Sequence, residues 1–262
     1  MEQKTSIIAT IGPASKSKEV LQKMAHAGLG IARLNLAWGT LPERAEEVAL
    51  IREVAREVGA PIVIMADTPR FRVQGEGSHT YDKNAAQSVA LTEQDKAFLH
   101  FAVEQDLEYV AVSFVGSKED VVAVRNFLQT LGGTQKIIAK IERKVALDHL
   151  SEIIAAADML MVARGDLGEE VPLAEIPFVQ QAILKEARAA GKSVIVATQM
   201  LLSMVEHPVP TRAEVSDVAY AVQDGAWGVM LSEESAQGAY PVEAVQSMSD
   251  IIAAASRYVK TL

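Results

Sequence analysis

Charged and other polar side chains lie at the ends of the apolar runs of this sequence, and these residues could do chemistry. The carboxylates among them are hard oxygen ligands, suited to Mg²⁺ or Mn²⁺. The arginine and lysine side chains suit a phosphate or carboxylate group. Together they predict a site for a metal ion and a small oxyanion, whose enolate or phosphoryl charge is stabilised electrostatically. These residues are Arg33, Asn35, Asp67, Thr68, Lys140, Glu142, Asp166 and Thr198.

Eight short apolar runs must position these side chains. The runs are rich in Val, Ile, Ala and Met, as strands buried on both faces are. Helical patterns lie between them, so strand and helix alternate eight times at a mean spacing of roughly 33 residues, as in a (β/α)8 TIM barrel. An open doubly wound sheet is the alternative, and the lack of a glycine-rich first turn counts against it. The predicted strands are residues 5–11, 30–36, 61–66, 109–114, 136–141, 159–163, 193–197 and 228–231.

A barrel of this type carries its active site at the carboxyl ends of the strands. Residues two apart in a strand share a face, so Lys140 and Glu142 should point the same way, as should Arg33 and Asn35. The alternative explanation for these charged residues is a set of internal ion pairs, such as Lys140 with Asp67 and Arg33 with Glu142. Burying charge at five strand ends is costly unless the charges are paired or hold a ligand. The convergence therefore favours a site.

Two connections between elements are unusual. The run Gly-Asp-Leu-Gly at residues 165–168 could present backbone amides to an anionic oxygen, or its glycines could simply form a turn. Residues 69–91 form an extended loop, far longer than the ~2–6 residues usual between a strand and a helix. Such loops are often functional, and a surface insertion is the equal alternative.

The composition bounds the class of protein. The 262 residues carry a net charge of −9, which disfavours nucleic acid and anionic membranes as partners. The absence of cysteine excludes disulfides, thiolate metal sites and a cysteine nucleophile. No apolar run approaches the ~18 residues of a membrane span. We expect one soluble, cytoplasmic α/β barrel domain over residues 1–262.

Several motifs resemble the barrel domain of pyruvate kinase, in collinear order over nearly the whole chain. If the resemblance holds, the chain has that family's fold and chemistry. The matching motifs include Ile-Ala-Thr-Ile-Gly-Pro-Ala-Ser at 8–15, Ala-Arg-Leu-Asn at 32–35, Leu-Thr-Glu-Gln-Asp at 91–95, Ile-Ala-Lys-Ile-Glu at 138–142, Met-Val-Ala-Arg-Gly-Asp-Leu-Gly at 161–168, Ala-Thr-Gln-Met-Leu at 197–201, Pro-Thr-Arg-Ala-Glu at 210–214 and Met-Leu-Ser-Glu-Glu at 230–234.

The resemblance implies catalytic and metal-binding roles for particular residues. Lys140 would neutralise the transferring phosphoryl group and the enolate oxygen, while Glu142 and Asp166 would bind Mg²⁺ or Mn²⁺. Thr198 would lie beside the reacting carbon and help to bind the carboxylate, with a proton-relay water. Gly165 and Asp166 would contact the substrate.

The resemblance also implies an anion pocket and a monovalent-cation site. Arg33 and Arg72 would contact the phosphate, Arg33 as a catalytic residue as well. A K⁺ site would draw on Asn35, Asp67 and Thr68.

The chain departs from the family pattern near that cation site and in its length. Ala37 lacks the hydroxyl that the family uses as a K⁺ ligand, and Trp38 replaces a histidine near the nucleotide. Arg70 could supply a fixed positive charge where K⁺ would sit. The family's lid domain is reduced to the loop 69–91, and its carboxy-terminal domain is absent from this sequence.

These features leave three hypotheses open. The first is pyruvate kinase-like phosphoryl transfer from phosphoenolpyruvate to ADP, with pyruvate and ATP as products, weakened because a lid that excludes water is missing. The second is a metal-dependent pyruvate aldolase, lyase or decarboxylase that needs no nucleotide. The third is a non-catalytic scaffold. The segment 200–217 resembles a subunit-contact region of the family, so we expect a homodimer or homotetramer.

Overall fold

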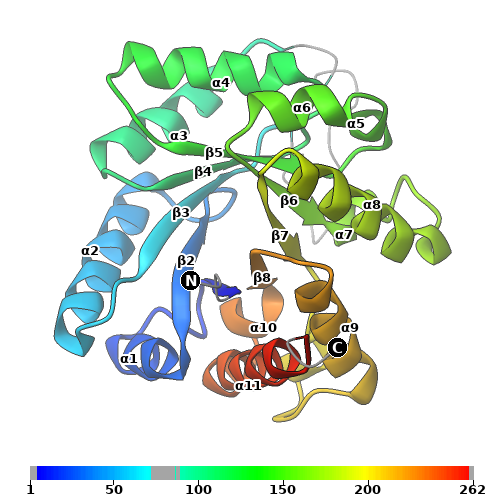
Figure 1. The fold of residues 1–262 in the computed structure, drawn as a ribbon. Helices are drawn as coiled ribbons and strands as arrows, with labels where there is room; N and C mark the ends of the chain where they lie inside the picture. Colours follow the sequence, from blue (N-terminus) through cyan, green and yellow to red (C-terminus); the bar gives the residue numbers. More distant parts are fainter. Residues whose placement is uncertain (1–4, 72–85, 87–88, 260–262) are drawn as a thin grey trace. The chain divides into compact units, whose positions relative to one another are not determined.

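The strands of the computed structural model, which describes residues 5–71, 86 and 89–259, are all parallel. Their hydrogen-bonded order, β1 to β8 in sequence, closes into a barrel (Figure 1). The predicted TIM-barrel fold is therefore confirmed. The strands are β1 (Ser6–Thr10), β2 (Leu29–Asn35), β3 (Val63–Thr68), β4 (Tyr109–Val112), β5 (Lys136–Ile141), β6 (Met159–Ala163), β7 (Ser193–Ala197) and β8 (Gly228–Leu231).

The third strand is displaced from its predicted position. It runs from Val63 to Thr68, two residues later than the predicted 61–66, so Asp67 and Thr68 belong to the strand instead of following it. The apolar pattern ends at Ala66, which is why the sequence placed the boundary there. Both polar side chains are nevertheless buried.

Helices follow the strands as the alternating pattern predicts. The helical pattern between β5 and β6 forms two helices, which meet at His149, where φ is −114° and ψ is 17°. The glycine run at 165–168 contributes most of a short helix, α7, instead of a loop. The helices are α1 (Lys18–Ala27), α2 (Leu41–Val58), α3 (Glu93–Glu104), α4 (Lys118–Thr130), α5 (Lys144–Asp148), α6 (Leu150–Ala156), α7 (Arg164–Leu167), α8 (Ile176–Ala189), α9 (Arg212–Gln223), α10 (Glu233–Ala236) and α11 (Pro241–Val259).

Local capping chemistry sets several of these boundaries. Thr92 and Asp95 form a capping box at the start of α3, and Thr211 and Glu214 form another at the start of α9. In each box the hydroxyl accepts a bond from an otherwise unpartnered N–H group and the carboxylate accepts one in return. Gly28 ends α1 with φ 112°, a conformation that side-chain-bearing residues rarely adopt.

The chain forms two compact parts. The terminal part comprises residues 1–34, 46–64 and 195–262, and the central part comprises residues 35–45 and 65–194. In the terminal part β1 pairs with β2 and β8, and β7 pairs with β8. In the central part β3, β4, β5 and β6 pair in that order. The interpretation of residues 1–262 as a single domain stays a prediction.

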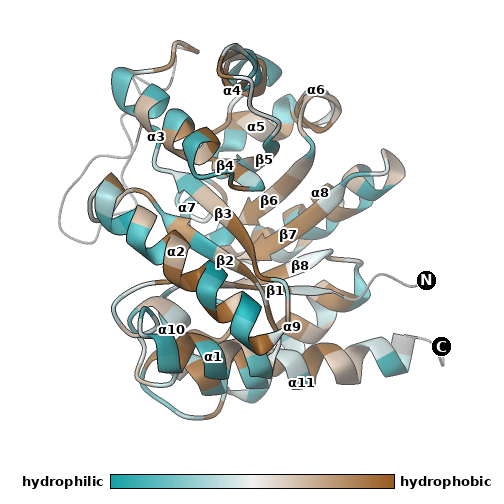
Figure 2. Cartoon of the chain, turned by 90° about the vertical axis from the view of Figure 1, so that its left-hand side faces the viewer, coloured by the Kyte–Doolittle hydropathy of each residue, from teal (hydrophilic) through white to brown (hydrophobic). Residues whose placement is uncertain are grey.

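Each part buries the apolar residues of its strands beneath its helices. In the terminal part α11 packs against α1 and α9. In the central part α4 lies between α3 and α6 (Figure 1). Figure 2 shows β3, β6 and β7 as hydrophobic along most of their length, whereas α2 and α11 alternate between hydrophilic and hydrophobic residues. The strands thus form the core, and the helices shield it with one face.

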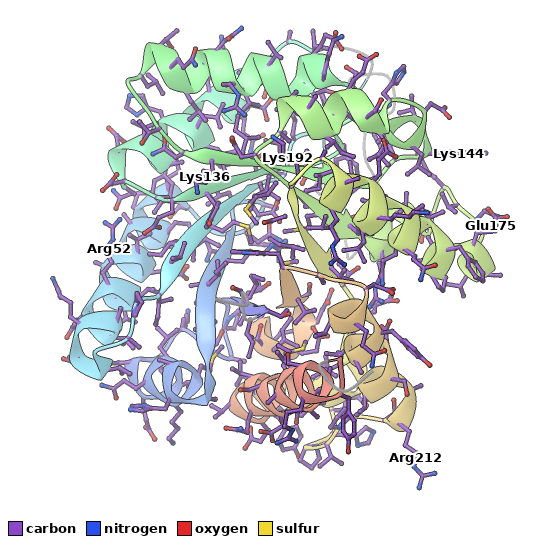
Figure 3. All side chains as sticks on the ribbon, in the orientation of Figure 1. Arg52, Lys136, Lys144, Glu175, Lys192 and Arg212 are labelled. Atoms are coloured by element: carbon purple, nitrogen blue, oxygen red, sulfur yellow. The ribbon has the colours of Figure 1, made fainter. Side chains whose placement is uncertain are left out.

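Charged side chains on the helices and their connections point outward, in contrast to those at the strand ends. Lys144, Glu175 and Arg212 are exposed and extend away from their own elements (Figure 3). Within the described part of the chain, no helix combines the length and the apolar character needed to cross a membrane.

Candidate functional site

The ammonium group of Lys140 lies among three oxygen atoms in the central part. Its Nζ donates to Ser113 Oγ at 2.8 Å and to Asp67 Oδ1 at 3.1 Å. It lies 2.9 Å from Glu142 Oε1, an ion pair whose geometry is not that of a hydrogen bond. The predicted shared face of Lys140 and Glu142 is confirmed by this distance. We call these four residues the Lys140 cluster.

The strand register explains why the Lys140 cluster forms. Asp67 of β3 pairs with Ala111 of β4, and Val112 of β4 pairs with Ala139 of β5. One step further along, Ser113 therefore stands beside Lys140 at the carboxyl ends of these strands. Three neighbouring parallel strands thus bring these polar groups to the same place, Asp67 from β3, Ser113 from the end of β4, and Lys140 with Glu142 from the end of β5.

The Lys140 cluster is almost completely buried. Asp67 and Glu142 are each 1% exposed, Lys140 is 4% exposed and Ser113 is fully buried. Two carboxylates face one ammonium, which leaves the cluster with one excess negative charge when all three groups are ionised. Burial of such charges costs several kcal/mol per ion, so pairing alone is a weak gain in stability. The ion pair between Lys140 and Asp67, considered above as an alternative, is present, with 3.1 Å between Nζ and Oδ1. Its presence does not exclude a functional site.

Phe114, the residue after Ser113, has a strained backbone. Its φ of 54° lies in the left-handed region, which costs a bulky residue on the order of 1–2 kcal/mol. This conformation aims its N–H group at Glu142 Oε2, at 2.6 Å, and its carbonyl accepts a bond from Arg143 Nη1 at 3.3 Å. Strain of this kind persists where the surroundings fix it, often at functional sites.

Glu142 and Asp166 follow neighbouring strands. Ile141 of β5 pairs with Val162 of β6, so Glu142 follows β5 beside the end of β6, and Asp166 lies in α7 directly after β6. Asp166 is 7% exposed. Among the described residues, no group of three or more acidic, histidine or cysteine side chains could hold a metal ion. Magnesium typically uses only one or two protein carboxylates, with water and substrate completing its shell. This pair of carboxylates fits a divalent ion.

The residues predicted to bind K⁺ are engaged with the protein. Thr68 Oγ1 donates to the Ala111 carbonyl at 3.1 Å, and Asn35 Oδ1 accepts from the Ala37 amide at 3.1 Å. The Asp67 carboxylate is part of the Lys140 cluster. The monovalent-cation site stays a prediction.

Arg70 has a structural partner. Its guanidinium donates to Asp120 Oδ1 at 2.8 Å and to the Val89 carbonyl at 3.2 Å, and it stacks over Phe71. Asp120 also accepts bonds from the Gly116 and Ser117 amides at the start of α4. The positive charge expected at the cation site is thus balanced by a carboxylate at the start of a helix.

Arg33 and Thr198 belong to the terminal part. Arg33 Nη1 donates to Thr10 Oγ1 at 2.8 Å, and this hydroxyl donates in turn to the Leu231 carbonyl. Thr198 and Gln199 follow β7 with φ values of 69° and 54°, two consecutive strained residues. Thr198 Oγ1 donates to the carbonyl of Ala197 at 2.6 Å. A second strained turn therefore marks the carboxyl end of β7.

Glu234 supports the turn after β7. Its side chain is fully buried, with Oε1 accepting from the Leu201 amide at 3.0 Å and Oε2 from the Ser232 amide at 2.7 Å. Desolvation by burial raises the pKa of this carboxyl above 4.5, against the lowering effect of its backbone hydrogen bonds. One carboxylate thus links the turns after β7 and β8.

The sequence predicts no role for Ser113, Phe114, Arg143 or Glu234. Ser113 had a signal, since it is the polar residue in the apolar run 109–114. Glu234 lies in a motif that carried the family resemblance. Neither the positive φ of Phe114 nor the contacts of Arg143 leave a trace in the sequence. The predicted phosphate residue Arg72, like most of the loop 69–91, lies outside the described residues.

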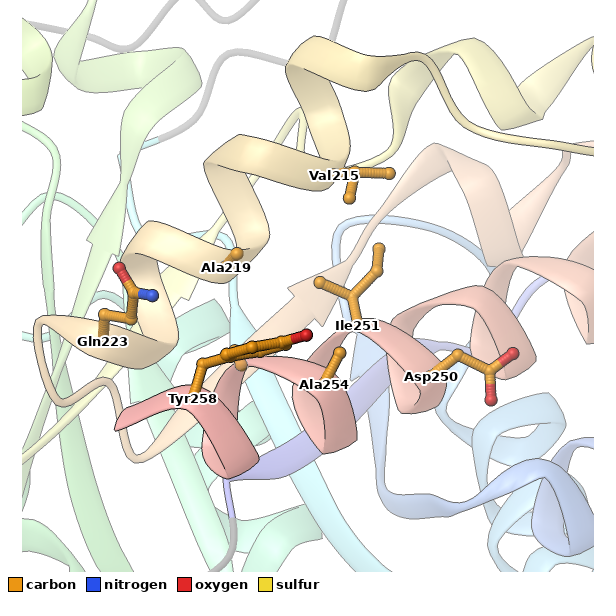
Figure 4. Close-up of a pocket in the computed structure, with 8 residues that line it drawn as sticks. Val215, Ala219, Gln223, Asp250, Ile251, Ala254 and Tyr258 are labelled. Atoms are coloured by element: carbon orange, nitrogen blue, oxygen red, sulfur yellow. The ribbon is translucent and has the colours of Figure 1, made fainter. Parts of the chain in front are cut away.

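An apolar hollow lies on the terminal part, between α9 and α11 (Figure 4). It measures about 370 Å³, and Val215, Ile251, Ala254 and Tyr258 contribute to its wall. The carboxylate of Asp250 at its rim accepts a bond from Gln246. Binding sites for small molecules combine apolar walls with several convergent polar groups. This hollow is a weaker candidate for a catalytic site than the Lys140 cluster.

A closed parallel barrel with buried charges at the carboxyl ends of its strands places the chain among the (β/α)8-barrel proteins, in which that end carries the active site. The family model "Pyruvate kinase, barrel domain" matches residues 2–84 and 81–245. The chain belongs to the pyruvate kinase family, and the resemblance is confirmed.

Individual relatives agree with the family model. Pyruvate kinase of Thermococcus litoralis is 35% identical, with 99% of this chain and 71% of the relative covered. Pyruvate kinase of Geobacillus stearothermophilus is 36% identical, covering 96% and 57%. Pyruvate kinase of Chlamydia trachomatis is 34% identical, covering 96% and 68%. The chain therefore spans between 57% and 71% of the length of these three relatives.

Proposed function

We propose that this chain is a pyruvate kinase-like enzyme that handles phosphoenolpyruvate or pyruvate as its enolate. The observation that supports the proposal is the buried Lys140 cluster at the carboxyl ends of three neighbouring strands, in a chain of the pyruvate kinase family. A buried ammonium group surrounded by oxygens can stabilise a negative charge that develops on a substrate oxygen. The cost of burying it is hard to explain by stability alone.

The residues of the central part divide the work in this proposal. Lys140 neutralises the enolate oxygen and, in phosphoryl transfer, the moving phosphoryl group. Asp67 and Ser113 hold its Nζ in place, at 3.1 and 2.8 Å. Glu142 and Asp166 would hold Mg²⁺ or Mn²⁺. Such an ion, when bound, supplies positive charge to the substrate oxygens.

Further residues have predicted roles in this proposal. Arg33 and Arg72 would bind the phosphate, and Gly165 with Asp166 would contact the substrate. Thr198 would bind the carboxylate and pass a proton to or from the reacting carbon through a water molecule. The strain at Thr198 and Gln199 supports a functional role for that turn, because strained residues cluster at active sites.

One observation favours a second candidate, an enolate enzyme that needs no nucleotide. The alignment with the Thermococcus relative extends over 337 positions, more than the 262 residues of this chain, so a stretch of the relative has no counterpart here. The family match is divided near residues 81–84, inside the loop 69–91. A lid that excludes water favours phosphoryl transfer over hydrolysis. We propose that phosphoryl transfer is weakened and that enolate formation is retained.

Exchange of the pyruvate methyl protons tests the proposal. The full chain is incubated with pyruvate in D2O, with and without Mg²⁺, and the methyl signal is followed by proton NMR. We expect exchange that depends on Mg²⁺ and is lost in Lys140→Met and Glu142→Gln. No exchange above the Lys140→Met background, even at high enzyme concentration, would contradict the enolate chemistry.

A coupled assay separates the two candidates. Pyruvate formation from phosphoenolpyruvate is measured with and without ADP. Activity that requires ADP supports the kinase, whereas methyl exchange without ADP-dependent turnover supports an aldolase, lyase or decarboxylase. Calorimetry with oxalate, an enolate mimic, tests the third hypothesis, because a scaffold would bind neither oxalate nor Mg²⁺. The homodimer or homotetramer stays a prediction, which sedimentation can check.

A further inference from the structure

We infer that Arg143 is a positioning residue that fixes Glu142 through the backbone of Phe114 and so sets the affinity of the site for a divalent cation. The inference rests on the proposed function, in which Glu142 is a metal ligand. Its own observations are the two anchors of the strained residue Phe114. The Phe114 N–H group is 2.6 Å from Glu142 Oε2, and the Phe114 carbonyl is 3.3 Å from Arg143 Nη1.

The backbone of Phe114 needs such an anchor on both sides. A φ of 54° has a conformational cost, which hydrogen bonds such as those to Glu142 and Arg143 must offset. The Glu142 bond is charge-assisted and short, and it fixes one carboxylate oxygen. The N–H group and the carbonyl of Phe114 belong to the two peptide groups on either side of its Cα, and its φ and ψ angles couple them. Removal of the Arg143 bond lets the φ of Phe114 relax toward an unstrained value, which shifts both peptide groups. The N–H group would then turn away, and the carboxylate of Glu142 would lose its fixed orientation.

A second contact shows that the surroundings accommodate the guanidinium. A Cβ atom added at Gly116 would lie 2.6 Å from Arg143 Nη1 and 3.3 Å from its Cζ. The absent side chain at Gly116 therefore leaves the space that the guanidinium occupies. The same Nη1 also donates to the Ala86 carbonyl at 3.1 Å, so Arg143 links Phe114 to a residue of the loop 69–91.

Three variants separate positioning from general destabilisation. Arg143→Met removes the guanidinium. Gly116→Ala keeps it and displaces it, because the clashing atoms belong to the far end of a flexible side chain. Arg125→Met is the matched control, since Arg125 also bonds a backbone carbonyl, Ala156 O at 2.9 Å, but at the residues that precede β6.

The first measurement needs no metal and no activity. The full chain is labelled with ¹⁵N-phenylalanine, which gives six amide signals at most, and Phe114→Leu assigns the signal of Phe114. A short bond to a carboxylate moves an amide proton downfield, so Glu142→Gln should move this signal upfield. We expect Arg143→Met and Gly116→Ala to move it in the same direction and Arg125→Met to leave it unchanged.

The second measurement is the dissociation constant for Mn²⁺, by calorimetry. Loss of a residue that orients a metal ligand typically costs tenfold to a hundredfold in affinity, and we expect a loss in that range for Arg143→Met. Unchanged Phe114 signal and unchanged Mn²⁺ affinity in both Arg143→Met and Gly116→Ala would overturn the inference. If Arg143→Met fails to fold, Gly116→Ala decides alone. A wild-type chain whose Mn²⁺ binding does not depend on Glu142 would instead contradict the proposed function, while the amide signal still tests Arg143.

Discussion

Replacing Lys140 by Met should destabilise the fold more than the loss of any single exposed ion pair would. The variant keeps most of the side-chain volume and removes the ammonium group, which lies 3.1 Å from Asp67 Oδ1 and 2.9 Å from Glu142 Oε1. At an effective dielectric constant of about 20, each such pair attracts with roughly 5 kcal/mol. Part of this is offset because the variant no longer has to desolvate an ammonium. Breaking a buried pair costs about 3–5 kcal/mol in net terms, and we expect that loss.

Urea unfolding measures this loss, followed by the fluorescence of the two tryptophans, Trp38 and Trp227. Domains have about 5–15 kcal/mol of stability, so the variant should remain folded with a much lower midpoint. Lys18→Met is the matched control, because Lys18 also faces two carboxylates, Glu53 at 2.6 Å and Glu57 at 2.7 Å, but in an exposed position. We expect a far smaller change there, since water screens exposed pairs. Equal losses in the two variants would refute the reasoning that burial makes the Lys140 cluster costly to break.

Three further predictions concern the terminal part. Burial raises the pKa of Glu234, so the stability that this group contributes is lost as pH rises above 4.5 through the folded-state pKa. Urea unfolding across a pH series should show this decline in the free energy of unfolding, and Glu234→Gln should flatten it. Desolvation alone would raise the pKa of Glu214, but hydrogen bonds from Ser203 and Thr211 outweigh it and lower the pKa, so the stabilising effect of Glu214 is present above pH 4.5 and lost in acid. Glu214→Gln should therefore cost about 1 kcal/mol of stability at neutral pH and little in acid, and a loss that does not depend on pH would contradict this. Gly12→Ala should cost about 1–3 kcal/mol, because its Cβ would lie 2.7 Å from the backbone oxygen of Ala236, whereas Gly30→Ala, with its nearest atom at 3.6 Å, serves as the control for thermal unfolding.

The positions of Lys140 and Glu142 could be predicted from the sequence, and their partners could not. Their spacing of two residues at the end of an apolar run predicts a shared face, and the Nζ–Oε1 distance of 2.9 Å confirms it. The sequence offers Asp67 as a partner of Lys140 only as one alternative, because the two residues lie 73 positions apart on strands that each pair with β4. Only the register between β4 and β5 places Ser113 beside Lys140, since a single polar residue in an apolar run does not indicate which residue lies next to it on the neighbouring strand.

The sequence alone determined the order of elements and the family. The spacing of apolar residues predicts strands and helices locally, and collinear motifs carry the family resemblance. The order of elements and the family therefore follow from short stretches of sequence. Only the tertiary structure decided what the charges touch. In the folded chain Arg70 binds Asp120, and the strained backbone of Phe114 directs its amide to Glu142. Such contacts depend on the register of strands and on backbone conformations that packing imposes, and neither follows from local preference.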